Sequence, residues 1–319
     1  MMFDRGVLIY NPTAGGGAGA AHVEAAREAL LVHVRIVDMA ATQRRDHATE
    51  LARAAQDSGA DLVIACGGDG TVNEVVQGLA PECKVPLMVL PGGTANVLRM
   101  EVGLPSDPRE AAALLPVLEE QEVPLGRVDF LKGGDSRYFL LMCGAGLDAE
   151  VAAGINRVVK RSLGEGAYWW SGMKQILRSF PRLRTVSVGS RKPSSFVVVS
   201  KSRMYGGGLV LTPRAHMLSE SFAVAEFSGT SRLAYCSHMI GVALGAAGRW
   251  RGIEHFFTDE IRLESDDGSE VKVQVDGEVE GTLPVRVTMC PQALRILLPA
   301  RYCVSPLGVR AEAAIPAHG

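Results

Sequence analysis

The sequence lacks an excess of positive charge and closely spaced cysteines, and each absence argues against a class of protein. It has no excess of positive charge, because its net charge is −2, so no basic field favours a nucleic-acid partner. Its six cysteines include no CxxC pair, which argues against a zinc site or a disulfide framework. It is not poor in apolar residues, since 47% of its 319 residues are hydrophobic and 21% are charged, which excludes a disordered chain.

Long apolar runs are also missing. The most apolar later stretch, residues 233–248, is too short to cross a bilayer and is interrupted by Ser237 and His238. The chain begins Met-Met-Phe-Asp-Arg-Gly and runs directly into a predicted strand, without the apolar segment of a signal peptide. We therefore expect a cytoplasmic protein that associates with membranes only transiently and at their surface.

The chain is organised around residues 61–76. An apolar strand is predicted at 62–66 and a helix from Thr71, and the loop between them reads Gly67, Gly68, Asp69, Gly70, Thr71. Glycines allow a ligand to approach the backbone closely, and the N–H groups at a helix N-terminus bind phosphate. A turn without a ligand has the same pattern. Asp69 would repel a phosphate unless it holds a cation, a set of donors or the loop itself.

Two further loops have this pattern. One follows a strand at 87–90 and reads Pro91, Gly92, Gly93, Thr94, Ala95, Asn96, and the other follows a strand at 7–10 and reads Asn11, Pro12, Thr13, Ala14, Gly15. Parallel strands present such loops at their carboxyl ends, where an open α/β sheet binds its ligands. Three loops of one kind in half of the chain favour a nucleotide cleft.

The order of predicted elements indicates two domains. Strands at 7–10, 34–37, 62–66 and 87–90 alternate with helices at 18–32 and 46–58, which predicts a doubly wound parallel α/β domain over residues 1–124. Beyond it, a series of strand candidates, several of which alternate strictly between apolar and polar residues, predicts an antiparallel β-sandwich over residues 125–301. These strands are expected at 126–131, 137–143, 184–188, 195–200, 222–227, 260–264, 271–275, 285–289 and 294–298.

Two predicted helices interrupt the sandwich. The helix at 149–180 combines aromatic and basic residues, which suits a lipid-entry element at a membrane surface, although packing on the sandwich with solvated charges explains the same pattern. The helix at 231–250 is more uniformly apolar and is expected to pack as core.

The two glycine loops resemble the diacylglycerol kinase catalytic family, which includes bacterial lipid kinases and the sphingosine and ceramide kinases. The resemblance rests on residues 67–71, on Asn73 and Glu74, and on residues 91–96. The first motif is shared with NAD kinases, and the pair is more specific. The resemblance implies that ATP and Mg²⁺ bind here and that the C-terminal tail, residues 302–319, returns to the first domain. It assigns ATP contacts to Asn11, Pro12, Thr13, Ala14, Gly15, Thr42, Gly67, Gly68, Asp69, Gly70, Thr71, Asn73, Glu74, Gly93, Thr94 and Asn96.

A third motif lies near the C-terminal end, where a strand at 271–275 is followed by Asp276, Gly277 and Glu278. Asp-Gly alone is typical of a hairpin turn. A kinase that acts on a hydroxyl group needs a carboxylate to accept the proton. The resemblance assigns this role to Asp276, with Glu278 supporting it or sharing it.

The chain departs from the family at three positions. Val97 stands where most relatives have an acid of the cleft, and Ser219 stands where an acid holds a structural magnesium. Mg²⁺ prefers carboxylate ligands, so this site is not expected unless Glu220 substitutes. Lys201 replaces an asparagine in the glycine-rich loop 200–208, where it either reaches phosphate or faces solvent.

Together these features predict an ATP-dependent lipid kinase that transfers the γ-phosphoryl group to a hydroxyl of a diacylglycerol-like or sphingoid lipid at a membrane surface. The alternatives are an NAD-kinase-like enzyme and a lipid- or nucleotide-binding protein without catalysis, which Val97 and Ser219 keep open. The resemblance also suggests a homodimer. The particular lipid is not indicated by the sequence.

Overall fold

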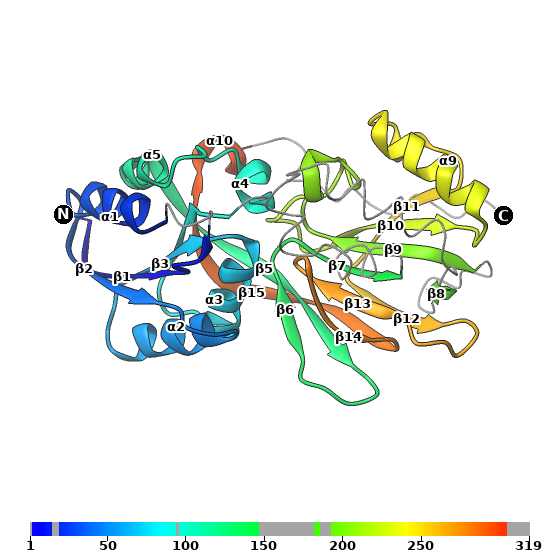
Figure 1. Cartoon of the computed structure of the whole chain (residues 1–319), viewed down its shortest axis with the longest axis horizontal. Helices are drawn as coiled ribbons and strands as arrows, with labels where there is room; N and C mark the ends of the chain where they lie inside the picture. Colours follow the sequence, from blue (N-terminus) through cyan, green and yellow to red (C-terminus); the bar gives the residue numbers. More distant parts are fainter. Residues whose placement is uncertain (1, 15–18, 94–95, 147–181, 186–192, 305–319) are drawn as a thin grey trace.

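The computed structural model describes residues 2–14, 19–93, 96–146, 182–185 and 193–304. Figure 1 shows an N-terminal part in which helices cover a sheet and a C-terminal part built mainly of strands, with two long strands running from one part into the other. The predicted helix at 149–180, most of the predicted strand at 184–188 and the tail from 305 lie outside the described residues. Among the described residues, no helix combines the length and apolarity needed to cross a bilayer.

The N-terminal part is the predicted doubly wound α/β domain. Its strands are parallel in the order β4-β3-β1-β2. They alternate with helices, and the elements are β1 Phe3–Tyr10, α1 Gly19–Leu30, β2 Val34–Ala41, α2 His47–Asp57, β3 Leu62–Gly67, α3 Asp69–Leu79, β4 Leu87–Pro91, α4 Val97–Val102, α5 Pro108–Ala113 and the 3-10 turn η2 Leu115–Val117.

Successive residues of the central strand face different helices. Leu62 and Ile64 share a core with residues of α1 and α5, whereas Val63 and Ala65 share a core with residues of α2 and α3. A strand covered on both faces must be apolar throughout, and every residue of β3 is buried.

The C-terminal part is antiparallel, as predicted, and its core lies between its strands. Its elements are β5 Leu118–Phe130, β6 Arg137–Phe139, β7 Met142–Gly146, β8 Leu183–Thr185, β9 Ser194–Ser200, η3 Gly206–Gly208, β10 Phe222–Ser228, α9 Arg232–Ala243, η4 Ala247–Arg249, β11 Ile253–Thr258, β12 Glu260–Ser265, β13 Lys272–Val275, β14 Glu278–Thr282, β15 Val285–Pro299 and α10 Ala300–Cys303. The sequence did not indicate β11 and β14 as strands.

The two long strands β5 and β15 join the parts. They pair with each other along most of their length. β15 pairs with β12 through Val285 and its neighbours and lies parallel to β4 at Ile296. The two strands predicted at 285–289 and 294–298 are thus one element with an irregularity between Cys290 and Leu294. The domain boundaries at 124 and 301 remain predictions, since these strands cross from one part into the other.

Two predicted elements differ in the structure. The strand expected at 137–143 is divided into β6 and β7, because the N–H groups of Leu140 and Leu141 donate to the carboxylate of Asp276 rather than to a neighbouring strand. The helix expected to pack as core instead exposes one side, with Leu233 84%, Ile240 54% and Leu244 70% exposed. On its opposite side Val242 is buried, and His238 is buried with its ring against Phe227 of β10. Because the sequence is apolar on both faces, it does not indicate which side is outward.

Candidate functional site

The loops predicted to bind a nucleotide lie at one edge of the parallel sheet. Tyr10 is in register with Cys66, and Gly67 with Pro91, so the loops that follow β1, β3 and β4 are neighbours. The N–H of Gly92 donates to the carbonyl of Gly67 at 2.8 Å. The N–H of Thr42, which follows β2, donates to Tyr10 at 2.8 Å.

The loop after β1 is closed by its own side chains. Asn11 accepts hydrogen bonds from the N–H and the hydroxyl of Thr13 at 2.9 and 2.8 Å, and its carbonyl accepts from the N–H of Ala14 at 3.1 Å. Pro12 lies in the same turn. Two predicted contact residues, Gly15 and Thr94, lie outside the described residues.

The glycine pairs of the second and third loops pack backbone against backbone. A Cβ on Gly93 would lie 2.4 Å from the Cα of Gly68, and a Cβ on Gly92 would lie 3.0 Å from the Cα of Gly67. No side chain fits at Gly93 unless the backbone moves. The glycines therefore bring the two loops together, whatever ligand they bind.

Asp69 holds the two loops together. Its carboxylate accepts from the N–H groups of Val97 at 3.0 Å and Leu98 at 3.2 Å. It lies in the first turn of α3 and at the N-terminus of α4, and helix N-termini stabilise negative charge. The sequence left open whether Asp69 holds a cation, a set of donors or the loop itself. The structure shows that it accepts hydrogen bonds from a set of donors. Val97 contributes one of these donors and buries its side chain.

Asn96 has the left-handed backbone that asparagine tolerates, with φ 47. Its amide oxygen accepts from the N–H of Gly93 at 3.0 Å, and its amide nitrogen donates to the carbonyl of Gly93 at 2.6 Å. Asn96 thereby closes the third loop at the start of α4.

Asp276 is buried at the end of β13, only 6% exposed, where four donors surround it. The N–H groups of Leu140, Leu141 and Met142 each lie 2.9 Å from its oxygens, and the amide of Asn73 lies 2.8 Å away. Burial raises the pKa of Asp276, and these hydrogen bonds oppose the rise. Asn73 belongs to α3, so the terminal motif meets the helix that follows the first glycine loop.

Glu278 is the accessible carboxylate of the terminal motif. It is exposed at the start of β14, and its Oε1 would lie 3.6 Å from a Cβ on Gly70. It therefore lies beside the first turn of α3, where the unpaired N–H groups of a helix N-terminus are found.

Glu74, predicted to contact ATP, has a contact at another helix. Its carboxylate accepts from the N–H of Ala48 at 3.1 Å, and its carbonyl accepts from the hydroxyl of Thr49 at 2.8 Å. The carboxylate of Glu74, which belongs to α3, thus lies at the first turn of α2 and satisfies an N–H that this helix leaves unpaired. This contact gives Glu74 a structural role.

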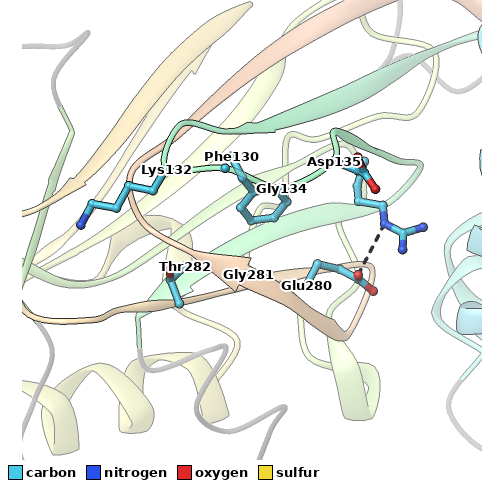
Figure 2. Close-up of a pocket in the computed structure, with 9 residues that line it drawn as sticks. Phe130, Lys132, Gly134, Asp135, Glu280, Gly281 and Thr282 are labelled. Carbon is cyan, nitrogen blue, oxygen red and sulfur yellow. Dashed lines mark ion pairs between the residues drawn. The ribbon is translucent and has the colours of Figure 1, made fainter.

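A small cavity adjoins the terminal motif (Figure 2). It has a volume of about 270 Å³ and lies between the turn after β5 and the strand β14. Glu280 lines it and pairs with Arg137 at 3.5 Å and with Arg45 at 2.5 Å. Burial raises the pKa of Glu280, while Arg137 lowers it. None of the lining residues belongs to the glycine loops, so the cavity is separate from the predicted nucleotide site.

Sequence reasoning missed Glu101. Its side chain is fully buried in α4 and accepts hydrogen bonds from the loop after β9 and from the C-terminal helix. The donors are the hydroxyl of Ser202 at 2.9 Å, the backbone of Arg203 at 2.9 Å and its Nε at 3.1 Å, the backbone of Met204 at 3.1 Å and the hydroxyl of Tyr302 at 3.0 Å. The only sign in the sequence is an acid in a short, mostly apolar helix.

The residues at the implied structural magnesium site do not suit that ion. The carbonyl of Ser219 accepts from the amino group of Lys201 at 2.7 Å. Mg²⁺ prefers carboxylate oxygens and retains several waters, whereas Ser219 offers a hydroxyl group and a carbonyl that already accepts from an amino group. Lys201 is fully buried, so neither predicted position, on phosphate or in solvent, is observed.

Comparison with known proteins agrees with this arrangement. Residues 5–128 match the diacylglycerol kinase catalytic domain, and residues 142–298 match the YegS C-terminal NAD kinase beta sandwich-like domain. A Chromohalobacter salexigens protein named "Probable lipid kinase YegS-like" is 36% identical over 187 residues, which are 56% of this chain and 58% of that protein. The diacylglycerol kinase of Bacillus subtilis is 26% identical over 306 residues, which are 92% of this chain and 96% of that protein.

A solved structure shares the whole fold. The crystal structure of a diacylglycerol kinase from Bacillus anthracis superimposes with a TM-score of 0.74 and covers 94% of this chain and 99% of that one, at 24% identity. At this identity the likeness concerns the fold. The two domain matches define a lipid kinase architecture. The chain belongs to the diacylglycerol kinase catalytic-domain family of lipid kinases.

Proposed function

We propose that the protein is an ATP-dependent kinase that transfers the γ-phosphoryl group to a hydroxyl of a diacylglycerol-like or sphingoid lipid. The observation that carries the proposal is the hydrogen bond between Asn73 and Asp276, which joins the first glycine loop and its helix to the carboxylates of the terminal motif. A kinase needs a phosphate site and an acceptor base within reach of each other. The relatives named as lipid kinases support this reading.

The phosphates of ATP would lie over the glycine loops, beside the N-terminus of α3. Asn11 and Thr13 follow β1, Thr42 follows β2, and Thr71 lies in the first turn of α3, so these side chains would be available to the nucleotide. Bound with ATP, Mg²⁺ supplies positive charge for the phosphoryl oxygens. The remaining stabilisation comes from backbone N–H groups that are already fixed in place.

The two carboxylates of the terminal motif would divide the work of proton transfer. Asp276 already accepts four hydrogen bonds, so its oxygens have little capacity left for a substrate hydroxyl. Glu278 is exposed beside Gly70 and is free to approach the acceptor. We therefore assign the base to Glu278 and the positioning of the surrounding loops to Asp276, which reverses the emphasis expected from the sequence.

The test is phosphate transfer from labelled ATP to a panel of lipids in mixed micelles with Mg²⁺. The panel contains diacylglycerol, a sphingoid base, ceramide and phosphatidylglycerol. Glu278→Gln is expected to lower kcat by about 10²–10⁴ with ATP binding retained, and Asp276→Asn to lower both activity and stability. Glu110→Gln, at an exposed helix position, is the control. ATP binding without transfer to any lipid of the panel would contradict the proposal and favour a binding protein without catalysis.

We infer further that the protein meets its lipid at an anionic membrane surface through α9. The outward side of this helix carries Leu233 and Ile240, and Leu244 follows its last residue; all three are more than half exposed. Figure 1 shows α9 on the outside of β10 and β11. Residues 227–253 contain no Asp or Glu, and Arg249 and Arg251 are exposed. Apolar side chains beside arginines suit an anionic bilayer. The homodimer suggested by the resemblance remains a prediction.

A further inference from the structure

Lys201 is one of the largest side chains that the fold buries completely. It directly follows β9, and its backbone N–H donates to the carbonyl of Leu141 at 2.8 Å. Its amino group donates to the carbonyl of Ser219 at 2.7 Å and lies 3.8 Å from the sulfur of Met289. One residue thereby joins two segments that come from different parts of the chain.

Burying an amino group is costly, because water solvates an ammonium strongly. Burial lowers the pKa of Lys201 to about 7, and the charge of Glu220 opposes this decrease. A buried lysine is retained where it has a partner. Its partner here is the backbone of Ser219, which occupies the position where the family resemblance places a magnesium-binding acid.

We propose that the amino group of Lys201 is a built-in replacement for the structural divalent cation, and that it fixes residues 216–221 without a metal. A cation bound to backbone oxygens can hold a loop in place. An amino group that donates to such an oxygen can hold the loop in the same way, and it is part of the protein itself. The bonded pair Lys201 and Ser219 thus stands at the two positions where the resemblance places the asparagine of the glycine-rich loop and the acid of the metal site.

This attachment reaches the candidate site. The backbone N–H of Lys201 donates to the carbonyl of Leu141, and the N–H of Leu141 donates to Asp276. The loop that the Lys201 side chain fastens is therefore attached, through the backbone of the same residue, to the segment that surrounds Asp276. The inference depends on the fold and not on the proposed reaction, so it can fail while the kinase assignment stands.

The first experiment uses the unaltered protein without nucleotide. We expect the same melting temperature in EDTA and in millimolar Mg²⁺, and the same rate of amide hydrogen exchange in residues 212–221. A melting temperature that falls in EDTA and recovers with Mg²⁺, or exchange in this segment that Mg²⁺ slows, would show that a metal holds the loop and would overturn the proposal.

The second experiment changes the pair. Lys201→Met leaves the carbonyl of Ser219 without its donor, so exchange in residues 212–221 is expected to accelerate by about tenfold, with or without Mg²⁺. The double variant Lys201→Asn with Ser219→Asp restores the family residues, and its exchange in this segment should become slower when Mg²⁺ is added. Lys84→Met, at an exposed lysine, is the control. Unchanged exchange in Lys201→Met would contradict the proposal even if the protein keeps its overall stability.

Discussion

The close contact between Gly93 and Gly68 can be tested by adding one methyl group to either residue. In Gly93→Ala the new Cβ would lie 2.4 Å from the Cα of Gly68, so the two loops must separate, at a cost of about 1–3 kcal/mol. The same substitution at the facing glycine, Gly68→Ala, places its Cβ 3.4 Å from the Cα of Gly93, which is an ordinary contact. Gly93→Ala should therefore lower both the melting temperature and ATP affinity.

Gly68→Ala is the matched control for stability, because it adds the same methyl group at the facing glycine. Its backbone is extended, with φ −84 and ψ 178, which alanine adopts without strain. Equal melting temperatures for the two variants would show that the loops are not in the contact described here.

His238 makes stability depend on pH. It is 4% exposed, burial lowers its pKa, and its Nδ1 has no hydrogen-bond partner in the part of the chain that the structure describes. Below about pH 6.5 the unfolded chain takes up a proton at this histidine while the native protein resists, so the free energy of unfolding decreases with falling pH until the lower native pKa is reached.

The measurement is the melting temperature between pH 7.5 and pH 5. His238→Gln should reduce the slope, and the slope that remains includes His216, whose pKa burial also lowers. A slope that is the same in His238→Gln and in the unaltered protein would rule out His238 as its source.

Single residues of the site were predictable where their role depends on the local sequence. The glycine loops could be recognised from the strand before them and the helix after them. The role of Asp69 could not, because its two donors lie on α4 and appear only when β3 and β4 are placed side by side. Glu101 was missed for the same reason, since its donors come from two distant segments.

Among the elements, α9 gives the clearest prediction. Replacing Leu233 and Leu244 together by glutamine removes two exposed leucines that would enter the bilayer interface, so binding to phosphatidylglycerol vesicles should weaken by about tenfold or more. Vesicle sedimentation measures this, with phosphatidylcholine vesicles for comparison. Binding to the anionic vesicles should also weaken in Arg249→Gln and at higher salt.

Val117→Gln is the control, because Val117 is 65% exposed but lies on η2 in the N-terminal part. Chromatography of the same variants separates a membrane face from a protein interface. If the leucine variants bind vesicles like the unaltered protein but no longer self-associate, then a second copy of the chain covers α9 and the membrane assignment is wrong.

The elements that the sequence did not predict share a physical cause. An apolar run continues through residues 138–143 without a sign of an interruption. The strand nevertheless breaks there, because Asp276, far along the sequence, accepts hydrogen bonds from the N–H groups of Leu140 and Leu141. The reverse happens at 285–298, where Pro291 suggests an interruption but β5 pairs with both halves of β15. In both cases a hydrogen-bonding partner that is distant in sequence determines where the strand begins and ends.

At the scale of the whole molecule, the pairing of β5 with β15 makes the two parts one sheet. Glu101 adds a second connection, since it joins α4 to the loop after β9 and to Tyr302. Two parts that share strands and a buried carboxylate should unfold together. We expect one thermal transition, with the same midpoint by circular dichroism and by tryptophan fluorescence.

Glu101→Gln tests how much the second connection contributes. The substitution replaces one acceptor oxygen by an NH₂ group that faces the existing donors, and it removes the charge that pairs with Arg203 at 3.1 Å. The loss should be about 3 kcal/mol in the free energy of unfolding, against little change for the exposed Glu110→Gln. Urea titration measures both. If Glu101→Gln instead separates the transition into two, the shared strands alone do not couple the parts, and the buried carboxylate is what makes the molecule unfold as a unit.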